Sequence, residues 1–498
     1  MVRMRPPDTH PRADPIPEDP MDDLAYLSTI ELAERISAGV VSSREATEAA
    51  LDRIGRLDGD TNIVVTLDGD RAVAAADAAD AARAAGFDLG PLHGVPVTIK
   101  DSFQTAGLRT TSGAPELSDH VPERDADPVA RLRDAGVVVL GKTNLPIYAG
   151  DWQSYNEVFG TSSNPWDTTR TVGGSSGGSA AALAAGFTPL ELGSDIAGSI
   201  RQPAHACGVV GHKPSYGIVS ARGQIPGPPG TLTQADLAVA GPLARTVDDC
   251  ELALELLAGA DAWHDLAWSL ELPPPRVTSA DGLRVAVWID EPSCPLSAEV
   301  RDLLLGVASA LSDAGAIVDD TARPAIDFAK AVRTFEQLLG SALSGAWTPD
   351  EIERMAAEPR TGGLGDTHAA LRHRSWLSAN ERRLQMRARW AEFFETWDVV
   401  LLPVAPVPAI PHDHGPVAER AIDVDGTSRP YTDQGPWMGL TGLAYLPATV
   451  VPAGLTSSGL PVGVQLAGPF LEDRTTLQAA RIVEELLGGF SPPPGYAS

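Results

Sequence analysis

Two stretches of small residues in the middle of the chain contain serines placed for chemistry. Residues 173–179 read Gly-Gly-Ser-Ser-Gly-Gly-Ser, and residues 193–201 read Gly-Ser-Asp-Ile-Ala-Gly-Ser-Ile-Arg. A serine hydroxyl becomes a nucleophile when a neighbouring base removes its proton. Glycine lets the backbone turn so that several N–H groups face one point, where they can bind a developing oxyanion. The two stretches therefore indicate nucleophilic catalysis.

A lysine upstream is a candidate for the base. Lys100 directly follows the apolar run Val95 to Ile99. Its reference pKa of ~10.4 prevents it from accepting a proton at neutral pH unless burial lowers that value by several units. A lysine at the end of a buried strand meets this condition. Two serine turns and this lysine can supply a nucleophile, a proton relay and a base without a histidine.

The glycine-rich stretch 173–179 also fits other structures. A flexible loop that caps the alanine-rich run after it needs the same residues. A phosphate-binding loop is disfavoured, because no Lys-Ser or Lys-Thr follows the glycines. Residues 174–178 match the Gly-x-Ser-x-Gly nucleophile elbow, which would make Ser176 the nucleophile. An elbow needs a strand directly before it, and residues 164–167 and 170–171 read as a loop. The plain alternative for residues 193–201 is a tight turn.

These motifs resemble the signature of the amidase signature family. The likeness is most specific from Gly173 to Pro214 and covers nearly all of residues 22–490, except the region 255–430. The flanking matches are Gly94 to Asp101, Gly141 to Asn144, Gly160 to Asp167 and Leu460 to Leu466. The resemblance implies one large α/β/α layered domain with a mixed central sheet over residues 21–498, with a helical, less specific region at about 255–430.

The resemblance also implies roles for single residues. Lys100 matches the base, Ser175 the bridging serine in a cis peptide bond, and Ser199 the nucleophile. The expected oxyanion hole consists of the backbone amides of Ile196, Ala197, Gly198 and Ser199. The expected supporting residues are Ser176, Asp195 and Arg201. The expected substrate pocket contains Tyr148, Trp152, Gln153, Tyr155 and Trp437.

Two positions depart from the family's pattern. Ala197 stands where many relatives have glycine, and an alanine can still supply its backbone N–H if φ stays negative. Residues 145–148, Leu-Pro-Ile-Tyr, lack the acidic residue that is common after the Lys-Thr-Asn loop. The second departure bears on substrate choice.

The elements that must hold these residues follow from apolar periodicity. Short apolar runs at 95–99, 137–140, 283–287 and 399–402 are bounded by Gly, Asp or Pro. Helical patterns at 43–54, 73–85 and 369–397 lie between them, and Ser28 with Glu31 has the spacing of a capping box. This alternation predicts an α/β layered domain around a buried sheet. Residues 1–20 are rich in proline and predict a disordered leader.

Composition limits the partners and cofactors. Over 498 residues, 66 acidic side chains face 38 basic ones, and a net charge of −28 repels phosphate backbones and anionic lipids. We therefore expect no nucleic-acid partner and no membrane partner. Only Cys207, Cys250 and Cys294 occur, which fits a reducing, cytoplasmic setting. The pairs His412 with His414 and His205 with Cys207 lack further ligands, so we expect no metal and no cofactor.

The residues and the resemblance together predict a hydrolase of amide-type C–N bonds that acts through an acyl-enzyme on Ser199. The expected substrate is a small-molecule amide or carbamate, and the same chemistry fits aryl esters. The expected enzyme is a monomer or a homodimer. Three alternatives remain open: a glutaminase-like subunit of a tRNA amidotransferase, an α/β-hydrolase esterase that uses Ser176, and a catalytically silent binding protein on the same scaffold.

Overall fold

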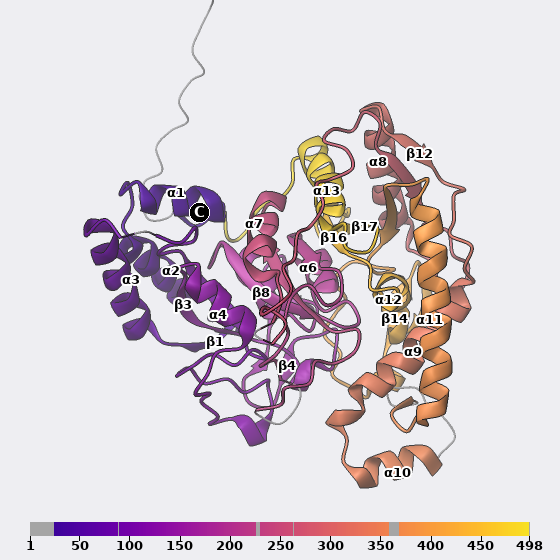
Figure 1. The fold of residues 1–498 in the computed structure, drawn as a ribbon, viewed down its shortest axis with the longest axis horizontal. Helices are drawn as coiled ribbons and strands as arrows, with labels where there is room; N and C mark the ends of the chain where they lie inside the picture. The colour runs from indigo at the N-terminus through magenta and orange to yellow at the C-terminus, as the bar shows by residue number, and fades with distance from the viewer. Residues whose placement is uncertain (1–23, 88, 226–229, 262, 358–367, 498) are drawn as a thin grey trace, which may run out of the picture.

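One central sheet of 11 strands organises the computed structural model (Figure 1). The structure describes residues 24–87, 89–225, 230–261, 263–357 and 368–497, so the predicted leader at 1–20 lies outside the described residues. The strands of the sheet, in spatial order, are β1 (Val64–Leu67), β3 (Val138–Thr143), β2 (Pro96–Lys100), β8 (Leu190–Asp195), β10 (Val239–Ala244), β9 (Val210–Lys213), β16 (Ala448–Leu455), β17 (Pro461–Ala467), β13 (Val399–Pro403), β11 (Arg284–Val287) and β12 (Ile317–Asp319).

The sheet is mixed. Strand β2 runs parallel to β3 and β8, and β11 runs parallel to β12 and β13. The strands between these two groups pair antiparallel. Every residue of β2, β8, β10 and β13 is buried, as expected for strands covered on both faces. The predicted α/β layered domain with a mixed central sheet is therefore confirmed.

Helices flank the sheet along its whole length. Figure 1 shows α1 to α4 on one side of the molecule and α8 to α11 on the other. The helices are α1 (Thr29–Ser37), α2 (Ser43–Leu57), α3 (Gly69–Ala84), α4 (Asp127–Asp134), α5 (Gly177–Ala184), α6 (Arg201–Cys207), α7 (Val247–Leu257), α8 (Ala298–Asp313), α9 (Phe328–Leu343), α10 (Pro349–Ala357), α11 (His373–Phe394), α12 (Pro436–Leu443) and α13 (Asp473–Leu487).

Helices α5 and α6 follow the two serine stretches. Every residue of both helices is buried, and α5 is apolar or small on all sides, as a helix inside a large core must be. The two helices pack against each other, α5 also contacts β2 and β8, and α6 contacts β9, β16 and β17. The end of β2, the start of α5 and the turn from β8 into α6 therefore lie in one buried region.

Several predicted elements are confirmed with small shifts in their bounds. Ser28 and Glu31 form the predicted capping box at the start of α1. The helix predicted at 43–54 is α2, and the one predicted at 369–397 is α11. Among the described residues, no helix is both long enough and apolar enough to cross a membrane.

The loop predicted at residues 164–167 and 170–171 is wrong in part. Residues 167–171 form a strand, β7 (Asp167–Thr171), which pairs with β6 (Ser163–Asn164) in a two-stranded sheet apart from the central one. Threonines at 168, 169 and 171 favour an extended backbone, because β-branched side chains fit a pleated surface. Two further two-stranded sheets pair β4 (Tyr155–Asn156) with β5 (Gly160–Thr161) and β14 (Ala421–Val424) with β15 (Thr427–Pro430).

Helix α11 provides a test of the packing. Trp390 on its inner face is 1% exposed and packs on the rings of Phe393 and Phe394, whereas Leu384 on its outer face is 46% exposed. Trp390→Ala should lower the free energy of unfolding by about 3–5 kcal/mol, because a large buried side chain leaves a cavity. Leu384→Ala, the control, should change it by less than about 0.5 kcal/mol. Urea unfolding followed by fluorescence measures both, and equal losses would contradict the packing described.

Candidate active site

Lys100 lies at the end of β2 with its side chain completely buried. Its Nζ donates hydrogen bonds to the Oγ atoms of Ser175 at 2.7 Å, Ser194 at 2.9 Å and Ser176 at 3.0 Å. Burial lowers the pKa of Lys100 to about 7, although the charge of Asp195 acts in the opposite direction. A substantial fraction of the lysine is therefore neutral near pH 7 and able to accept a proton.

Ser175 joins the lysine to the second serine stretch. The Gly174–Ser175 peptide bond is cis, and the Ser175 side chain is completely buried. The backbone N–H of Ser176 donates to the carbonyl oxygen of Ser199 at 3.0 Å, so the two serine turns are directly bonded. Within the described ranges, no hydrogen bond joins the side-chain oxygens of Ser175 and Ser199. The structure thus places Lys100 in contact with Ser175, and places Ser199 on the adjoining turn.

The Ser199 turn presents free backbone donors. The carbonyl of Gly198 accepts from the N–H of Gln202 at 2.7 Å, which holds the Gly198–Ser199 peptide plane in place. The N–H of Gly198 donates to Asp195 Oδ1 at 2.8 Å, so this amide, predicted for the oxyanion hole, already has an acceptor. In the part of the chain that the structure describes, no acceptor binds the N–H groups of Ile196, Ala197 and Ser199. Ala197 keeps a negative φ, as a non-glycine donor at this position requires.

Asp195 and Arg201 form a completely buried ion pair. Arg201 Nη2 lies 2.8 Å from Asp195 Oδ1, and Arg201 Nε lies 2.9 Å from Oδ2. Burial by itself would raise the pKa of Asp195, but the charge and hydrogen bonds of Arg201 lower it to about 2. Arg201 Nη1 also donates to Met438 O, Thr441 Oγ1 and Gln465 Oε1. The pair therefore stays charged and ties the Ser199 turn to α12 and β17.

The hydroxyl of Ser176 is bound on several sides by hydrogen bonds within the protein. Its buried Oγ accepts from Lys100 Nζ and from the N–H of Ser194 at 3.2 Å, and donates to the Ser194 carbonyl at 3.3 Å. The preceding β7 belongs to a separate two-stranded sheet, unlike the strand that an esterase elbow requires. The buried His205 and His212 bond elsewhere, to the backbone of residues 407 and 463 and to the side chains of residues 449 and 473. These contacts disfavour Ser176 as a nucleophile.

The residues predicted for a substrate pocket occupy different places. Trp437 is completely buried in an aromatic cluster, with ring centroids 5.0 Å from Phe328 and 6.1 Å from Trp288. It therefore belongs to the core rather than to an open pocket wall, because apolar partners from α9 and from the residue after β11 cover it. Tyr148 is half-buried, and its hydroxyl bonds the exposed carboxylate of Glu116.

Trp152, Gln153 and Tyr155 lie on one segment that faces the Ser199 turn. Trp152 Nε1 donates to the carbonyl oxygen of Ala197 at 2.9 Å. Gln153 exchanges two hydrogen bonds with the backbone of Asp413. The Tyr155 ring stacks on His414 at 3.9 Å between centroids. The segment thus links the Ser199 turn to the loop at 412–415.

The cysteine and histidine pairs show no metal site. The rings of His412 and His414 lie 5.9 Å apart, and the described residues contain no group of three or more His, Cys, Asp or Glu side chains placed to bind a metal. Cys207 is buried, and burial raises the pKa of its thiol far above the usual range. A thiol in that environment is a poor nucleophile.

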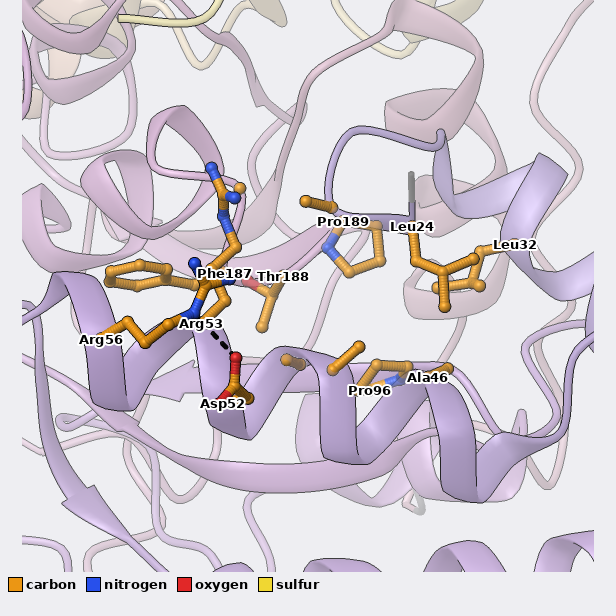
Figure 2. A pocket seen from close by; sticks show the side chains of 14 residues that line it. Leu24, Leu32, Ala46, Asp52, Arg53, Arg56, Pro96, Phe187, Thr188 and Pro189 are labelled. Atoms are coloured by element: carbon orange, nitrogen blue, oxygen red, sulfur yellow. Dashed lines mark hydrogen bonds and ion pairs between the residues drawn. The ribbon is translucent and has the colours of Figure 1, made fainter. Parts of the chain in front are cut away.

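Two hollows lie away from these residues. One, which Figure 2 shows, lies between α2 and the turn at 186–189. Its volume is about 20 Å³, with room for about one water molecule. Another, of about 330 Å³, lies between α1, residues 89–93 and Leu252. Neither is lined by Lys100, Ser175 or Ser199, so neither is a candidate for the reaction site.

The chain is similar to known proteins over most of its length. The Amidase family model matches residues 45–477. A glutamyl-tRNA(Gln) amidotransferase subunit from Moorella thermoacetica is 35% identical, over 93% of this chain and 97% of the relative. An inhibitor-bound chain from a vestigial complex that reveals the origins of an s-triazine catabolic enzyme has a TM-score of 0.80 and 30% identity, covering 93% and 99% of the two chains. A 6-aminohexanoate cyclic dimer hydrolase complexed with substrate has a TM-score of 0.77 and 25% identity, covering 95% and 99%.

Proposed function

The chain belongs to the amidase signature family of enzymes that hydrolyse amide C–N bonds, and we propose that Ser199, Ser175 and Lys100 carry out this hydrolysis as nucleophile, proton relay and base. The observation that carries the proposal is the 2.7 Å hydrogen bond between Lys100 Nζ and Ser175 Oγ in a fully buried environment. Burial lowers the pKa of Lys100 to about 7, so the base is available at neutral pH.

The proposed reaction has two halves. Neutral Lys100 takes a proton through Ser175 from Ser199, whose Oγ then attacks the substrate carbonyl carbon. The oxyanion that forms accepts hydrogen bonds from the free N–H groups of Ile196, Ala197 and Ser199. The C–N bond breaks as the proton returns through Ser175 to the departing amine nitrogen. Water then attacks the Ser199 ester, releases the acid and restores the serine.

The proposed substrate is a small-molecule amide, with carbamates and aryl esters as further members of the class. A solved relative that is 25% identical hydrolyses the cyclic dimer of 6-aminohexanoate, a compound with amide bonds. Carbamates and aryl esters belong to the proposed substrate class because the same serine can attack their carbonyl carbon. Their leaving groups also depart at least as readily as an amine. The net charge of −28 disfavours a direct contact with RNA.

A second candidate is a glutaminase-like subunit of a tRNA amidotransferase. It is favoured by the 35% identity to an amidotransferase subunit over 97% of that relative's length. The two candidates differ in their partners and in their substrate. A glutaminase subunit would copurify with partner subunits and hydrolyse glutamine, whereas a free amidase would act alone on other amides.

A turnover screen on the purified chain tests the proposal. We expect hydrolysis of at least one compound among aryl amides, primary aliphatic amides and aryl carbamates, with no partner protein added. Glutamine is included as the diagnostic substrate of the second candidate. Turnover confined to glutamine, together with partner subunits that copurify from the native source, would replace the first candidate with the second.

Labelling tests the nucleophile. A fluorophosphonate should add once to the intact protein, and peptide mass spectrometry should place the adduct on Ser199, because only that hydroxyl is proposed to become acylated. Ser199→Ala should lose the adduct. Ser176→Ala is the matched control, because it removes a nearby hydroxyl that bonds Lys100 directly, and it should keep the adduct. An adduct on Ser176 would contradict the proposal and support the nucleophile elbow, in which Ser176 is the nucleophile.

The pH dependence tests the base. Because neutral Lys100 is the active form, kcat/KM should rise about tenfold per pH unit below about 7 and level off above it. Lys100→Ala should lose about 10²–10⁴-fold in kcat/KM. Lys100→Arg should lose as much, because arginine keeps its proton and cannot accept one from Ser175. Near-normal activity of folded Lys100→Arg on the same amide would remove Lys100 from the mechanism.

A further inference from the structure

One short segment, residues 151–153, touches both serine turns. On one side it packs on Gly174, where an added Cβ would lie 2.6 Å from the carbonyl oxygen of Asp151 and 2.8 Å from the nitrogen of Gln153. On the other side the indole N–H of Trp152 donates to the carbonyl oxygen of Ala197 at 2.9 Å. The position of this segment therefore affects the cis peptide at Ser175 and the turn that carries Ser199.

The bond from Trp152 holds a peptide plane next to the nucleophile. The carbonyl of Ala197 and the N–H of Gly198 belong to one rigid plane. Trp152 binds the carbonyl end, and Asp195 Oδ1 accepts from the N–H end at 2.8 Å. With both ends bound, the plane cannot rotate freely. The free N–H groups on either side, those of Ala197 and Ser199, are therefore held in a set direction.

Asp151 in turn holds Trp152. Its Oδ1 accepts from the backbone N–H of Trp152 and from the hydroxyl of Tyr431, both at 2.7 Å. Its Oδ2 accepts from Arg420 Nη1 at 2.6 Å and from the hydroxyl of Tyr155 at 3.1 Å. The Tyr431 ring packs on the Trp152 indole with centroids 5.7 Å apart. Asp151, Tyr155, Arg420 and Tyr431 are here called the Asp151 cluster.

The Asp151 cluster is largely closed to water. Asp151 is 8% exposed, Arg420 5% and Tyr431 1%. A buried carboxylate that accepts four hydrogen bonds, one of them from a guanidinium, has a fixed orientation, because any rotation would break bonds that water cannot replace. Arg420 and Tyr431 flank the β14–β15 hairpin, and the N–H of Tyr431 donates to the Arg420 carbonyl at 3.1 Å. The hairpin region therefore fixes where Trp152 lies.

We propose that the Asp151 cluster and Trp152 are positioning residues for amide hydrolysis: the cluster holds Trp152, and Trp152 holds the peptide plane that aims the backbone N–H groups of the Ser199 turn. The inference rests on the proposed function of that turn. In the part of the chain that the structure describes, no hydrogen bond joins these side chains to the side chains of Lys100, Ser175 or Ser199. Their loss acts on the transition state, where the oxyanion forms, more than on binding of the uncharged carbonyl.

A matched pair of tryptophans separates positioning from general stability. Trp166 Nε1 donates to the carbonyl oxygen of Cys207 at 2.9 Å, the same bond at the same length as that of Trp152, at the far end of α6 from the Ser199 turn. Trp152→Phe and Trp166→Phe each remove one indole donor and keep an aromatic ring. Only the first should disturb the N–H groups near Ser199.

Steady-state kinetics on the amide found by the turnover screen give the test. Trp152→Phe should lower kcat about 10- to 100-fold with KM within about threefold, because small misplacements of catalytic groups cost rate. Trp166→Phe should keep both constants near those of the wild type. Tyr431→Phe removes one bond to Asp151 and leaves its charge pair intact, so kcat should fall by a smaller factor, again with little change in KM.

The double variant Trp152→Phe/Tyr431→Phe completes the cycle. If both residues act through one chain of contacts, the double variant should be no slower than Trp152→Phe within about twofold. If instead the two losses in kcat multiply in the double variant, the residues act independently, and the proposed series of contacts is overturned. If the wild-type enzyme is active and the kcat and KM of Trp152→Phe equal those of Trp166→Phe, this inference is overturned and the proposed function stands. If the wild-type enzyme is inactive on every amide tested, both the inference and the proposed function are overturned. If Trp152→Phe does not fold, an unchanged kcat in Tyr431→Phe overturns the inference.

Discussion

The burial of the Lys100 amine is the constraint on which the rest of the site depends. A charged ammonium is costly inside a protein, so an interior lysine loses its proton more easily than one in water. Three serine hydroxyls receive its hydrogen bonds, and none of them carries a charge that would hold the proton. The nearest influential carboxylate, Asp195, is bound on both oxygens by Arg201. A carboxylate bonded directly to Lys100 would stabilise its ammonium form, which cannot accept a proton.

The same burial explains the small residues around the site. Every residue of α5 and α6 is buried, and both helices pack directly on the sheet and on each other. This packing brings the two serine turns within hydrogen-bonding distance. Gly198 has a φ of +106°, and a Cβ there would collide with Met438. A larger residue at this position would have to displace the Met438 side chain and take a backbone conformation that residues with a Cβ rarely adopt. The backbone hydrogen bond from Ser176 to Ser199 places Ser199 and the free N–H groups of its turn beside Ser175.

The sequence predicted those parts of the structure that depend on neighbours along the chain. Lys100 at a strand end, the serine turns before α5 and α6, and the capping box at Ser28 are all local patterns, and the structure contains each of them. The Asp151 cluster could not be found in this way, because Arg420 and Tyr431 lie 269 and 280 residues from Asp151. The core position of Trp437 likewise depends on side chains from distant segments, those of Phe328 and Trp288. The bond between the Gly198 amide and Asp195 is local, but the residue types alone do not show which amides of the turn stay free.

This division between local chemistry and distant support has a consequence for the family. Relatives that are 25–35% identical over nearly their whole length carry different activities in their names, from an amidotransferase subunit to a cyclic dimer hydrolase. The signature residues from Gly173 to Pro214 are close in sequence and bury one another. Larger side chains at these positions would therefore disturb the packing. The 412–434 segment reaches the Ser199 turn through Gln153, Asp151 and Trp152. Substitutions in that segment can therefore alter the rate without altering the signature, because they move the groups that hold the backbone donors.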